Sequence, residues 1–494
     1  MNKTELEIFI KNNHAVSSKQ IIKHFTALGE KSDTIRKAIS RLKQPYMRLK
    51  YIRLANNAQI LYHKDNWHTL AFCKEVTKIL KEENSVYAAA LEAIGGYILE
   101  KYFPVISGSG EQKKHIWPTQ IKDNLISSGL LIEDNIENFS KILYLTEFEI
   151  DNITKFVHAY CIQEQITLQL VEDWLKKLNF ITYNQTCHKN LNDPLPKFAT
   201  TYWDITSPSY LLPLMQNNKQ GSVVCDLFLK DISDISQIQY IIKKLELLSV
   251  QKNISRYLPL VIAPSFSKDV FMNLKSKGII PATFENLFGK ETAKLFEELY
   301  WSLQNLAAAI TKNPDKLYTI FEKISAFENI SNQIRGPLFE MICLHLVHTM
   351  RLGFVENGKN IFCQTLKKYL ELDIINESPT EIYIVECKGY LPHRSISTQE
   401  IKEWLDNITH IRKSLIAMNE ERNNKKFIFN FWTSSSFSEE SINLLKEKNT
   451  NSQIEIQWRD GPEIMQEIKK HKLKGAEKML NDYFFKNFLD KQIS

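Results

Sequence analysis

The fold of this chain is decided at residues 369–389, which read YLELDIINESPTEIYIVECKG. Two apolar runs flank a polar turn that contains Pro379, so the stretch predicts two strands joined as a β-hairpin. Three charged side chains, Asp373, Glu386 and Lys388, interrupt runs that otherwise predict buried strands. Glu and Lys are almost never fully buried unless they are paired, so these side chains need an explanation.

The expected strand geometry brings these charges together. Side chains alternate between the faces of a strand, so Glu386 and Lys388 share one face and Cys387 points to the other. A hairpin places Asp373 on the neighbouring strand, with Glu371 on the same face two residues earlier. We therefore expect two acids and an amine at one edge of a sheet.

Such a group suits metal chemistry on a phosphate. Carboxylate and water oxygens are the ligands that Mg²⁺ or Mn²⁺ prefers. A bound metal polarises a phosphodiester and lowers the pKa of an attacking water. Lys388 would orient or deprotonate that water, or neutralise charge on the phosphate. The alternative is an ordinary ion pair between Glu386 and Lys388 at a strand end, with Asp373 as a surface acid.

The whole chain has the composition of a soluble globular protein, with 494 residues, 43% hydrophobic and 24% charged. This length is too great for one core, so about two to four domains are expected. No apolar run reaches the roughly 20 residues of a membrane-spanning helix, and the N-terminus lacks a secretion signal. The seven cysteines are scattered without a C-x-x-C pair. This pattern favours a reducing, cytoplasmic location and argues against a zinc site or a disulfide framework.

Residues 1–65 predict a winged-helix domain with a strongly basic surface. They carry nine Lys and four Arg against three Glu and two Asp, a net charge of +8 in a chain whose total is +6. One helix is expected to begin near Thr4, and a second at Ser17 with Gln20 in a capping box. Ser32 is expected to cap a third helix from Asp33 to Lys43, and strands at 47–54 and 59–63 follow.

A winged helix with a basic exposed helix is typical of duplex DNA binding. The candidate nucleic-acid-binding residues are Arg36, Lys37, Ser40, Lys43, Arg48, Lys50 and Arg53. The alternative is a winged helix used as a protein contact or dimer module.

The rest of the chain divides into four further predicted regions. Residues 66–150 predict a second, weaker winged-helix-like or helical domain, with a strand at 141–148. Residues 155–290 predict an α/β domain with a strand at 180–184, and residues 291–335 predict a helical connector. Residues 336–494 predict a second α/β domain with a long helix at about 398–418. Together they predict a multidomain α/β protein with an α+β N-terminus.

The two α/β regions share an order of elements, which suggests internal copies. Both place Ser-Phe-Ser before a helix and a final strand, at 265–267 and 436–438. Asp204 and Asp226 then correspond to Asp373 and Glu386. Phe228 stands where the second copy has its lysine, with Lys230 one step further on the same face. The alternative is two ordinary α/β domains.

The C-terminal residues resemble the PD-(D/E)xK nuclease superfamily, the restriction-endonuclease-like fold. Asp373 and the triplet 386–388 carry this resemblance, and the helix start at 336–340 is similar to that of Mrr-like members. Leu372 replaces the leading Pro of the motif. The resemblance covers about residues 330–460. It implies that Asp373 and Glu386 hold metal, that Lys388 serves the water, and that Glu340 completes the catalytic and metal site. If residues 155–290 are also nuclease-like, Phe228 at the lysine position makes them a degenerate, inactive domain that would serve DNA binding or scaffolding.

The expected function is therefore a Mg²⁺- or Mn²⁺-dependent DNA endonuclease, with double-stranded DNA as its partner. The resemblance further suggests a bacterial restriction or antiphage role, with a homodimer or accessory defence subunits. Two alternatives stay open: a non-catalytic DNA-binding regulator with inactive nuclease-like domains, and an RNA or single-strand nuclease. Arg335 and the run at 393–395 are expected either to contact phosphates or simply to be solvated loop residues.

Overall fold

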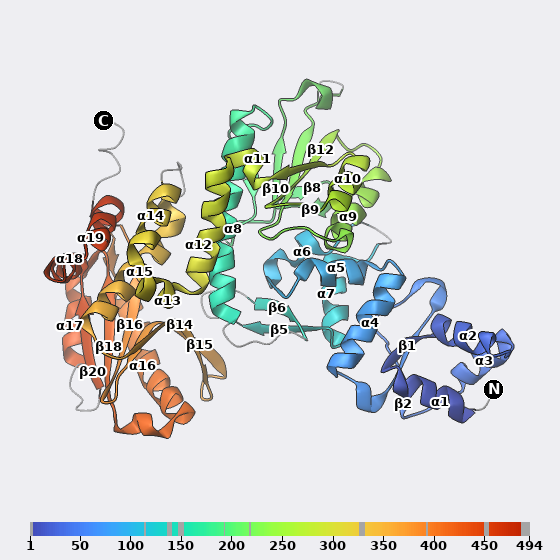
Figure 1. The fold of residues 1–494 in the computed structure, drawn as a ribbon, viewed down its shortest axis with the longest axis horizontal. Coiled ribbons are helices and arrows are strands. Elements are labelled where there is room, and N and C mark those ends of the chain that lie inside the picture. Colours follow the sequence, from blue (N-terminus) through green and yellow to red (C-terminus); the bar gives the residue numbers. More distant parts are fainter. Residues whose placement is uncertain are drawn as a thin grey trace. The chain divides into compact units, whose positions relative to one another are not determined.

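The protein is a multidomain α/β protein whose chain forms two compact units. The first contains residues 1–150 and 172–287, and the second contains residues 151–171 and 288–494. Figure 1 shows the helices and small sheets of this computed structural model. The structure describes residues 3–112, 115–135, 141–146, 153–191, 193–216, 219–325, 331–391, 394–448 and 454–485. Across these ranges, every helix is too short or too polar to cross a membrane.

The N-terminal region folds in the order helix, strand, two helices, two strands. Its sheet has the strand order β1-β3-β2, with antiparallel pairs. A small core of its own includes Leu6, Ile21 and Ile39. The elements are α1 (Lys3–Asn12), β1 (Ala15–Ser17), α2 (Ser18–Ala27), α3 (Ser32–Ser40), β2 (Tyr46–Arg48) and β3 (Ile60–His63).

Local predictions in this region were partly right. The capping box of α2 is confirmed, because Ser17 and Gln20 exchange side-chain and backbone hydrogen bonds. The cap of α3 was wrong: Lys31 is its N-cap, without a side-chain hydrogen bond, and the helix ends at Ser40. The strand predicted at 47–54 was too long. Beyond β2, the Leu49 N–H still donates to the Ile60 carbonyl oxygen. Leu49, Ile52 and Leu54 are buried in the core of the unit, whereas Tyr51 is exposed.

The next region repeats this arrangement after one leading helix. From α5 onward its order is helix, strand, two helices, two strands, and its strand order β4-β6-β5 corresponds to β1-β3-β2. The predicted strand at 141–148 ends at Leu145, and 147–148 lie outside the described residues. The elements are α4 (Leu70–Glu82), α5 (Val86–Ile94), β4 (Tyr97–Leu99), α6 (Phe103–Ile106), α7 (Pro118–Ser127), β5 (Leu131–Asn135) and β6 (Lys141–Leu145).

The first five-stranded sheet has the order β13-β12-β11-β10-β7. The strand predicted at 180–184 does not form; these residues are irregular, and the edge strand β7 follows them. The elements are α8 (Ile153–Lys177), β7 (Cys187–His188), β8 (Lys197–Phe198), β9 (Thr201–Tyr202), β10 (Ile205–Pro208), β11 (Ser222–Leu227), α9 (Gln239–Ser249), β12 (Tyr257–Ala263), α10 (Lys268–Ser276) and β13 (Ile280–Thr283).

The predicted connector, residues 291–335, is helical in its described residues and packs into the hydrophobic core of the second unit. Phe321 and Leu317 are buried with Phe339 of the following helix, so these helices form part of the second unit. The N-terminal part of α8, up to Val171, also belongs to that unit. The helices are α11 (Phe284–Phe288), α12 (Lys290–Gln304), α13 (Leu306–Lys312), α14 (Pro314–Ser325) and α15 (Ser331–Met350).

The second five-stranded sheet has the order β14-β15-β16-β18-β20. Apolar side chains on its two faces belong to two cores, one shared with α15 and the other with α16. The elements are β14 (Phe354–Cys363), β15 (Lys368–Glu377), β16 (Glu381–Lys388), β17 (Ser395–Ile396), α16 (Thr398–Met418), β18 (Lys426–Thr433), β19 (Ser436–Phe437), α17 (Glu439–Lys448), β20 (Ile454–Arg459), α18 (Gly461–Lys470) and α19 (Lys474–Leu480).

The two five-stranded sheets have the same topology. Counted from β7 or from β14, two antiparallel pairs precede two parallel pairs. Both copies add a small parallel bridge at the same place, Ile232 with Phe266 and Ile396 with Phe437. This shared detail supports the hypothesis of an internal duplication.

Candidate active site

The site begins where the β15–β16 hairpin ends. The two strands pair antiparallel, and the last paired residues on this side are Ile374 and Val385. One step further stand Asp373 and Glu386. There, Asp373 Oδ2 accepts a hydrogen bond from the backbone N–H of Cys387 at 2.7 Å. We call this contact the aspartate clamp, because a side chain replaces the next backbone bond of the ladder.

Glu386 and Lys388 lie on one face of β16, as the alternation predicts. Lys388 Nζ donates to Glu386 Oε1 at 2.7 Å, and both side chains are about one-quarter to one-third exposed. Cys387 points to the other face, in the core that also contains Val385 and Tyr383. The charged groups therefore sit at the rim of the sheet, accessible to solvent but close to the core.

Helix α15 brings Glu340 to this rim. The helix passes so close to the end of β16 that a Cβ on Gly389 would lie 2.8 Å from Phe339 Cβ and 3.0 Å from the Arg335 carbonyl oxygen. A glycine is therefore needed directly after the triplet 386–388. Glu340 interacts electrostatically with both Glu386 and Lys388. We call Glu340, Asp373, Glu386 and Lys388 the acidic site.

The carboxylates of the acidic site compete for protons. Burial raises the pKa of Asp373 well above its ordinary value, and the neighbouring Glu386 and Glu340 raise it further. Burial also raises the pKa of Glu340 to about 7, with Lys388 opposing and Glu386 adding to the rise. The acids are therefore close enough to repel one another, and one ammonium group does not balance them.

Lys388 stays positively charged in this setting. Burial disfavours its charge, but the Glu386 and Asp373 carboxylates outweigh burial and raise the pKa of Lys388. A charged Lys388 is suited to orienting a water or neutralising a phosphate, two of the roles expected from the sequence.

The donor set suits a hard divalent cation by its chemistry. If all four groups are ionised, three carboxylates and one ammonium leave a net charge of −2, and carboxylate oxygens are ligands for Mg²⁺ or Mn²⁺. The side chains are not gathered around one point: within the described ranges, no group of three His, Cys, Asp or Glu is arranged to hold a metal ion. Glu386 is instead turned toward Lys388.

The neighbouring polar residues have mixed roles. Arg335 is buried, and its Nε donates to the Tyr483 carbonyl oxygen at 3.4 Å, so it stabilises the fold. Arg394 lies over the Tyr390 ring at 3.7 Å and pairs with Glu400, which also accepts from the Tyr390 hydroxyl. Arg394 is more than half exposed, so it stays a candidate for contacting phosphate, whereas His393 lies outside the described residues.

Most of the predicted nucleic-acid-binding side chains are exposed. This holds for Arg36, Lys37, Ser40, Lys43, Lys50 and Arg53. Arg48 is different, because its guanidinium donates to the carbonyl oxygens of Ile39 and Ser40 and to Gln59. It ties the C-terminal end of α3 to the wing and is largely committed to the fold.

Comparisons with known proteins leave the family of this chain open. No protein-family model matches it, and no curated protein does. Among solved structures, the MspJI restriction endonuclease in complex with a 27-mer oligonucleotide is similar over 37% of this chain and 39% of that chain, with 12% identity and a TM-score of 0.17. A likeness this weak carries no argument about the site, which must be judged from its geometry.

Proposed function

We propose that the protein is a metal-dependent nuclease that hydrolyses phosphodiester bonds in DNA at the acidic site. The observation that carries this proposal is the cluster of mutually repelling carboxylates beside a permanently charged lysine, at the rim of a sheet. A structural ion pair would need one acid for Lys388, and the clamp uses one oxygen of Asp373. Glu340 is a further acid beside them, and a divalent cation would offset the excess negative charge of the three carboxylates.

Each residue of the acidic site has a distinct part in this proposal. Asp373, Glu386 and Glu340 would hold the divalent cation, which supplies charge neutralisation at the phosphate and a more acidic bound water. Lys388 would contact the scissile phosphate or orient the water through its ammonium group. Burial raises the pKa of Glu340 to about 7, and a bound cation would favour its ionised form.

DNA would be captured by the N-terminal region. Its exposed basic residues lie on α3 and beyond it toward the wing, and phosphate contacts of this kind position a protein on a duplex. Cutting both strands with one acidic site per chain would call for two copies, so a homodimer or an accessory subunit is part of the proposal. A role in restriction or antiphage defence stays a prediction.

The test is cleavage of plasmid DNA by the purified full-length protein with Mg²⁺ or Mn²⁺. Wild type should cut, EDTA should stop cutting, and Glu386→Gln should reduce the rate by about 100- to 1,000-fold or more while DNA binding and thermal unfolding are kept. The matched control is Glu455→Gln, another strand carboxylate paired with a lysine, Lys426. It should cut as wild type does.

The same experiment separates the alternatives. Duplex binding without cleavage under any divalent cation would favour a non-catalytic regulator. Cleavage of single strands or RNA in preference to duplex DNA would favour the other alternative. Full activity in purified Glu386→Gln would refute the acidic site as the catalytic centre.

A further inference from the structure

The first five-stranded sheet contains a counterpart of the acidic site at the same topological position. The antiparallel pairing of β10 and β11 ends at Ile205 and Cys225, as that of β15 and β16 ends at Ile374 and Val385. The next residues are Asp204 and Asp226. Asp204 Oδ2 accepts from the backbone N–H of Leu227 at 2.7 Å, so this copy has its own aspartate clamp.

The lysines of the two copies come from different places. Phe228 occupies the position of Lys388, and Lys230 is exposed. Two other lysines reach the acids instead. Lys244 of α9 contacts Asp226 Oδ2 at 2.5 Å, and Lys189 contacts Asp204 Oδ1 at 2.6 Å. In this copy Lys244 of a helix pairs with the acid, whereas in the acidic site Lys388 of the strand does so. The two copies therefore differ by more than the substitution of one residue.

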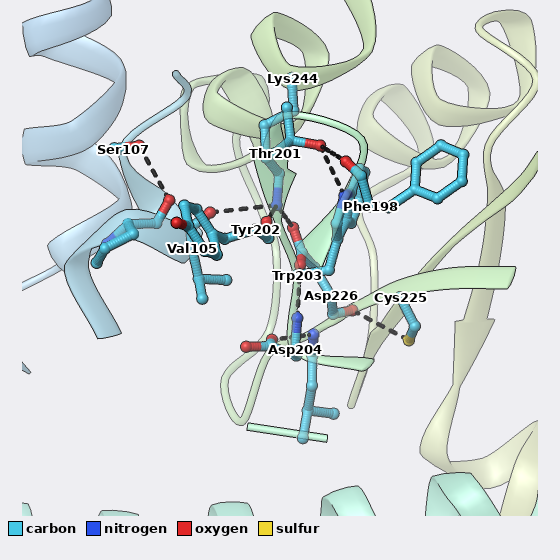
Figure 2. A network of polar contacts seen from close by, with 12 residues as sticks. Val105, Ser107, Phe198, Thr201, Tyr202, Trp203, Asp204, Cys225, Asp226 and Lys244 are labelled. Atoms are coloured by element: carbon cyan, nitrogen blue, oxygen red, sulfur yellow. Dashed lines mark hydrogen bonds and ion pairs between the residues drawn. The ribbon is translucent and has the colours of Figure 1, made fainter. Parts of the chain in front are cut away.

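Lys244 is surrounded by oxygen atoms. Besides Asp226, its Nζ donates to the carbonyl oxygens of Tyr202 at 3.0 Å and Val105 at 3.2 Å (Figure 2). The Trp203 ring centroid lies 3.9 Å from Nζ. A carboxylate and two carbonyl oxygens are the kind of ligands that a hard metal cation takes, and here an ammonium group holds them.

The counterpart is also closed to solvent and electrically balanced. Asp226 and Lys244 are fully buried, and Asp204 and Lys189 are 2% and 5% exposed. Two acids meet two ammonium groups, whereas the acidic site carries an excess of two negative charges when ionised. A divalent cation would bring excess charge into the buried counterpart, and unpaired buried charge is strongly unfavourable.

We propose that the Lys244 ammonium takes the place of a metal ion in this buried counterpart, so that the first α/β copy is a metal-free tie. It binds the copy to Val105 at the end of α6, in the region that follows the N-terminal winged-helix-like module. The copy therefore serves as a support for the DNA-binding side of the molecule and performs no hydrolysis. The tie is defined by contrast with the proposed metal at the acidic site, so the two must be tested separately.

Electron paramagnetic resonance can measure Mn²⁺ binding to the full-length chain and thereby test the tie separately from the acidic site. Wild type reports the acidic site. The double variant Asp373→Asn/Glu386→Gln removes that site, so it should bind at least about tenfold less Mn²⁺. The triple variant that adds Lys244→Ala to this double variant should gain a new Mn²⁺ site. A quadruple variant that also carries Asp226→Asn should lose the new site.

The outcomes for wild type and for the Lys244 variant are independent. Wild type without Mn²⁺ binding would undermine the proposed nuclease but not the tie. The tie is refuted if the Asp373→Asn/Glu386→Gln protein still binds Mn²⁺ through Asp226, or if a folded Lys244→Ala variant gains none.

A double-mutant cycle covers the case in which Lys244→Ala does not fold. Lys244→Met alone leaves Asp226 buried without its partner and should lower the unfolding temperature strongly, whereas Lys244→Met with Asp226→Asn should recover part of the loss. Additive losses would contradict the proposed pairing. The exposed Lys230→Met is the matched control and should unfold as wild type does.

Discussion

At the scale of single residues, Glu340 and Lys388 have opposite protonation preferences within the acidic site. Glu340 is held partly neutral near pH 7, while Lys388 is held charged. Neighbouring groups with strongly shifted pKa values, one kept neutral and the other kept charged, are common at functional sites. They also give predictions that do not depend on knowing the substrate.

The first prediction concerns the pH dependence of stability. The pKa of Glu340 is raised from 4.5 to about 7, so its contribution to stability is complete below about pH 4.5 and is lost as the pH rises through 7. Glu340→Gln removes the ionised form. We expect it to stabilise the protein by roughly 1–3 kcal/mol at pH 8.5 and to have little effect near pH 4.5.

Urea denaturation at the two pH values measures this difference. Glu455→Gln is a suitable control, because Lys426 lowers the pKa of Glu455 and the substitution should not stabilise the protein at either pH. A Glu340→Gln variant that is less stable than wild type at pH 8.5 would contradict the assigned environment.

A second prediction tests the charge of Lys388. Because the group acts as an ammonium, Lys388→Arg should keep part of the cleavage rate, whereas Lys388→Met should lose about 100- to 1,000-fold. Single-turnover cleavage at fixed metal concentration measures both rates. If Arg and Met are equally inactive, a role as base or a strict geometric requirement replaces charge neutralisation.

At the scale of elements, the close approach of α15 to the end of β16 assembles the acidic site from distant parts of the chain. Glu340 precedes Asp373 by more than thirty residues, and only the packing at Gly389 brings the helix to the strand end. Gly389 is therefore a structural requirement of the site.

Gly389→Ala should disturb this packing. Its Cβ would meet Phe339 and the backbone of Arg335, so we expect a loss of roughly 1–3 kcal/mol in stability and a matching loss of cleavage. Gly336→Ala is the control, since a Cβ at that position would have no other atom within 4 Å and alanine favours a helix. Thermal unfolding of both variants tests the idea, which fails if Gly389→Ala is as stable as Gly336→Ala.

Elements also show how far the sequence could be interpreted. The hairpin of 369–388 and the helix α16 at Thr398–Met418 were predicted closely, because the hydrophobic periodicity of a strand or a helix is a local signal. Lys244 and Lys189 were missed. Lys244 lies on the apolar stripe of α9, in phase with Ile241 and Leu248, but a lysine at such a position usually reaches solvent. Only the tertiary partners from other segments show that it is buried.

The partners of Arg48 were missed for the same reason. Arg48 was predicted to contact DNA because its charge continues that of α3, and in the structure its guanidinium donates to carbonyl oxygens at the end of that helix. Its contact with DNA stays a prediction. The metal-ligand assignments of Asp373, Glu386 and Glu340 remain predictions. Strand pairing, which the sequence indicates, brings Asp373 close to Glu386. The packing of α15 that brings Glu340 to them, and the final orientation of the side chains, could not be predicted from the sequence.

At the scale of the whole molecule, basic charge and the acidic site occupy separate compact units. The basic residues of α3 belong to the first unit and the acidic site to the second. Binding and cleavage should therefore respond to different substitutions.

Arg36→Ala with Lys37→Ala tests this separation. Each lost phosphate contact lowers the slope of log affinity against log salt by about 0.9, so the slope should fall by up to about 2, while the cleavage rate at saturating DNA is unchanged. Lys78→Ala, an exposed lysine on α4, should leave the slope unaltered. Binding isotherms at several salt concentrations decide the matter; an unchanged slope in the double variant would exclude α3 as a phosphate-binding surface.

The aspartate clamp has a consequence for coordination chemistry. In both copies one carboxylate oxygen of the aspartate is engaged by a backbone N–H. We therefore expect a bound cation to contact Oδ1 of Asp373, the carboxylate oxygen that the clamp does not use. Asn in its place would keep the clamp through its amide oxygen but present an NH₂ group to the ligand. This makes Asp373→Asn a substitution that removes the donor while leaving the strand end intact.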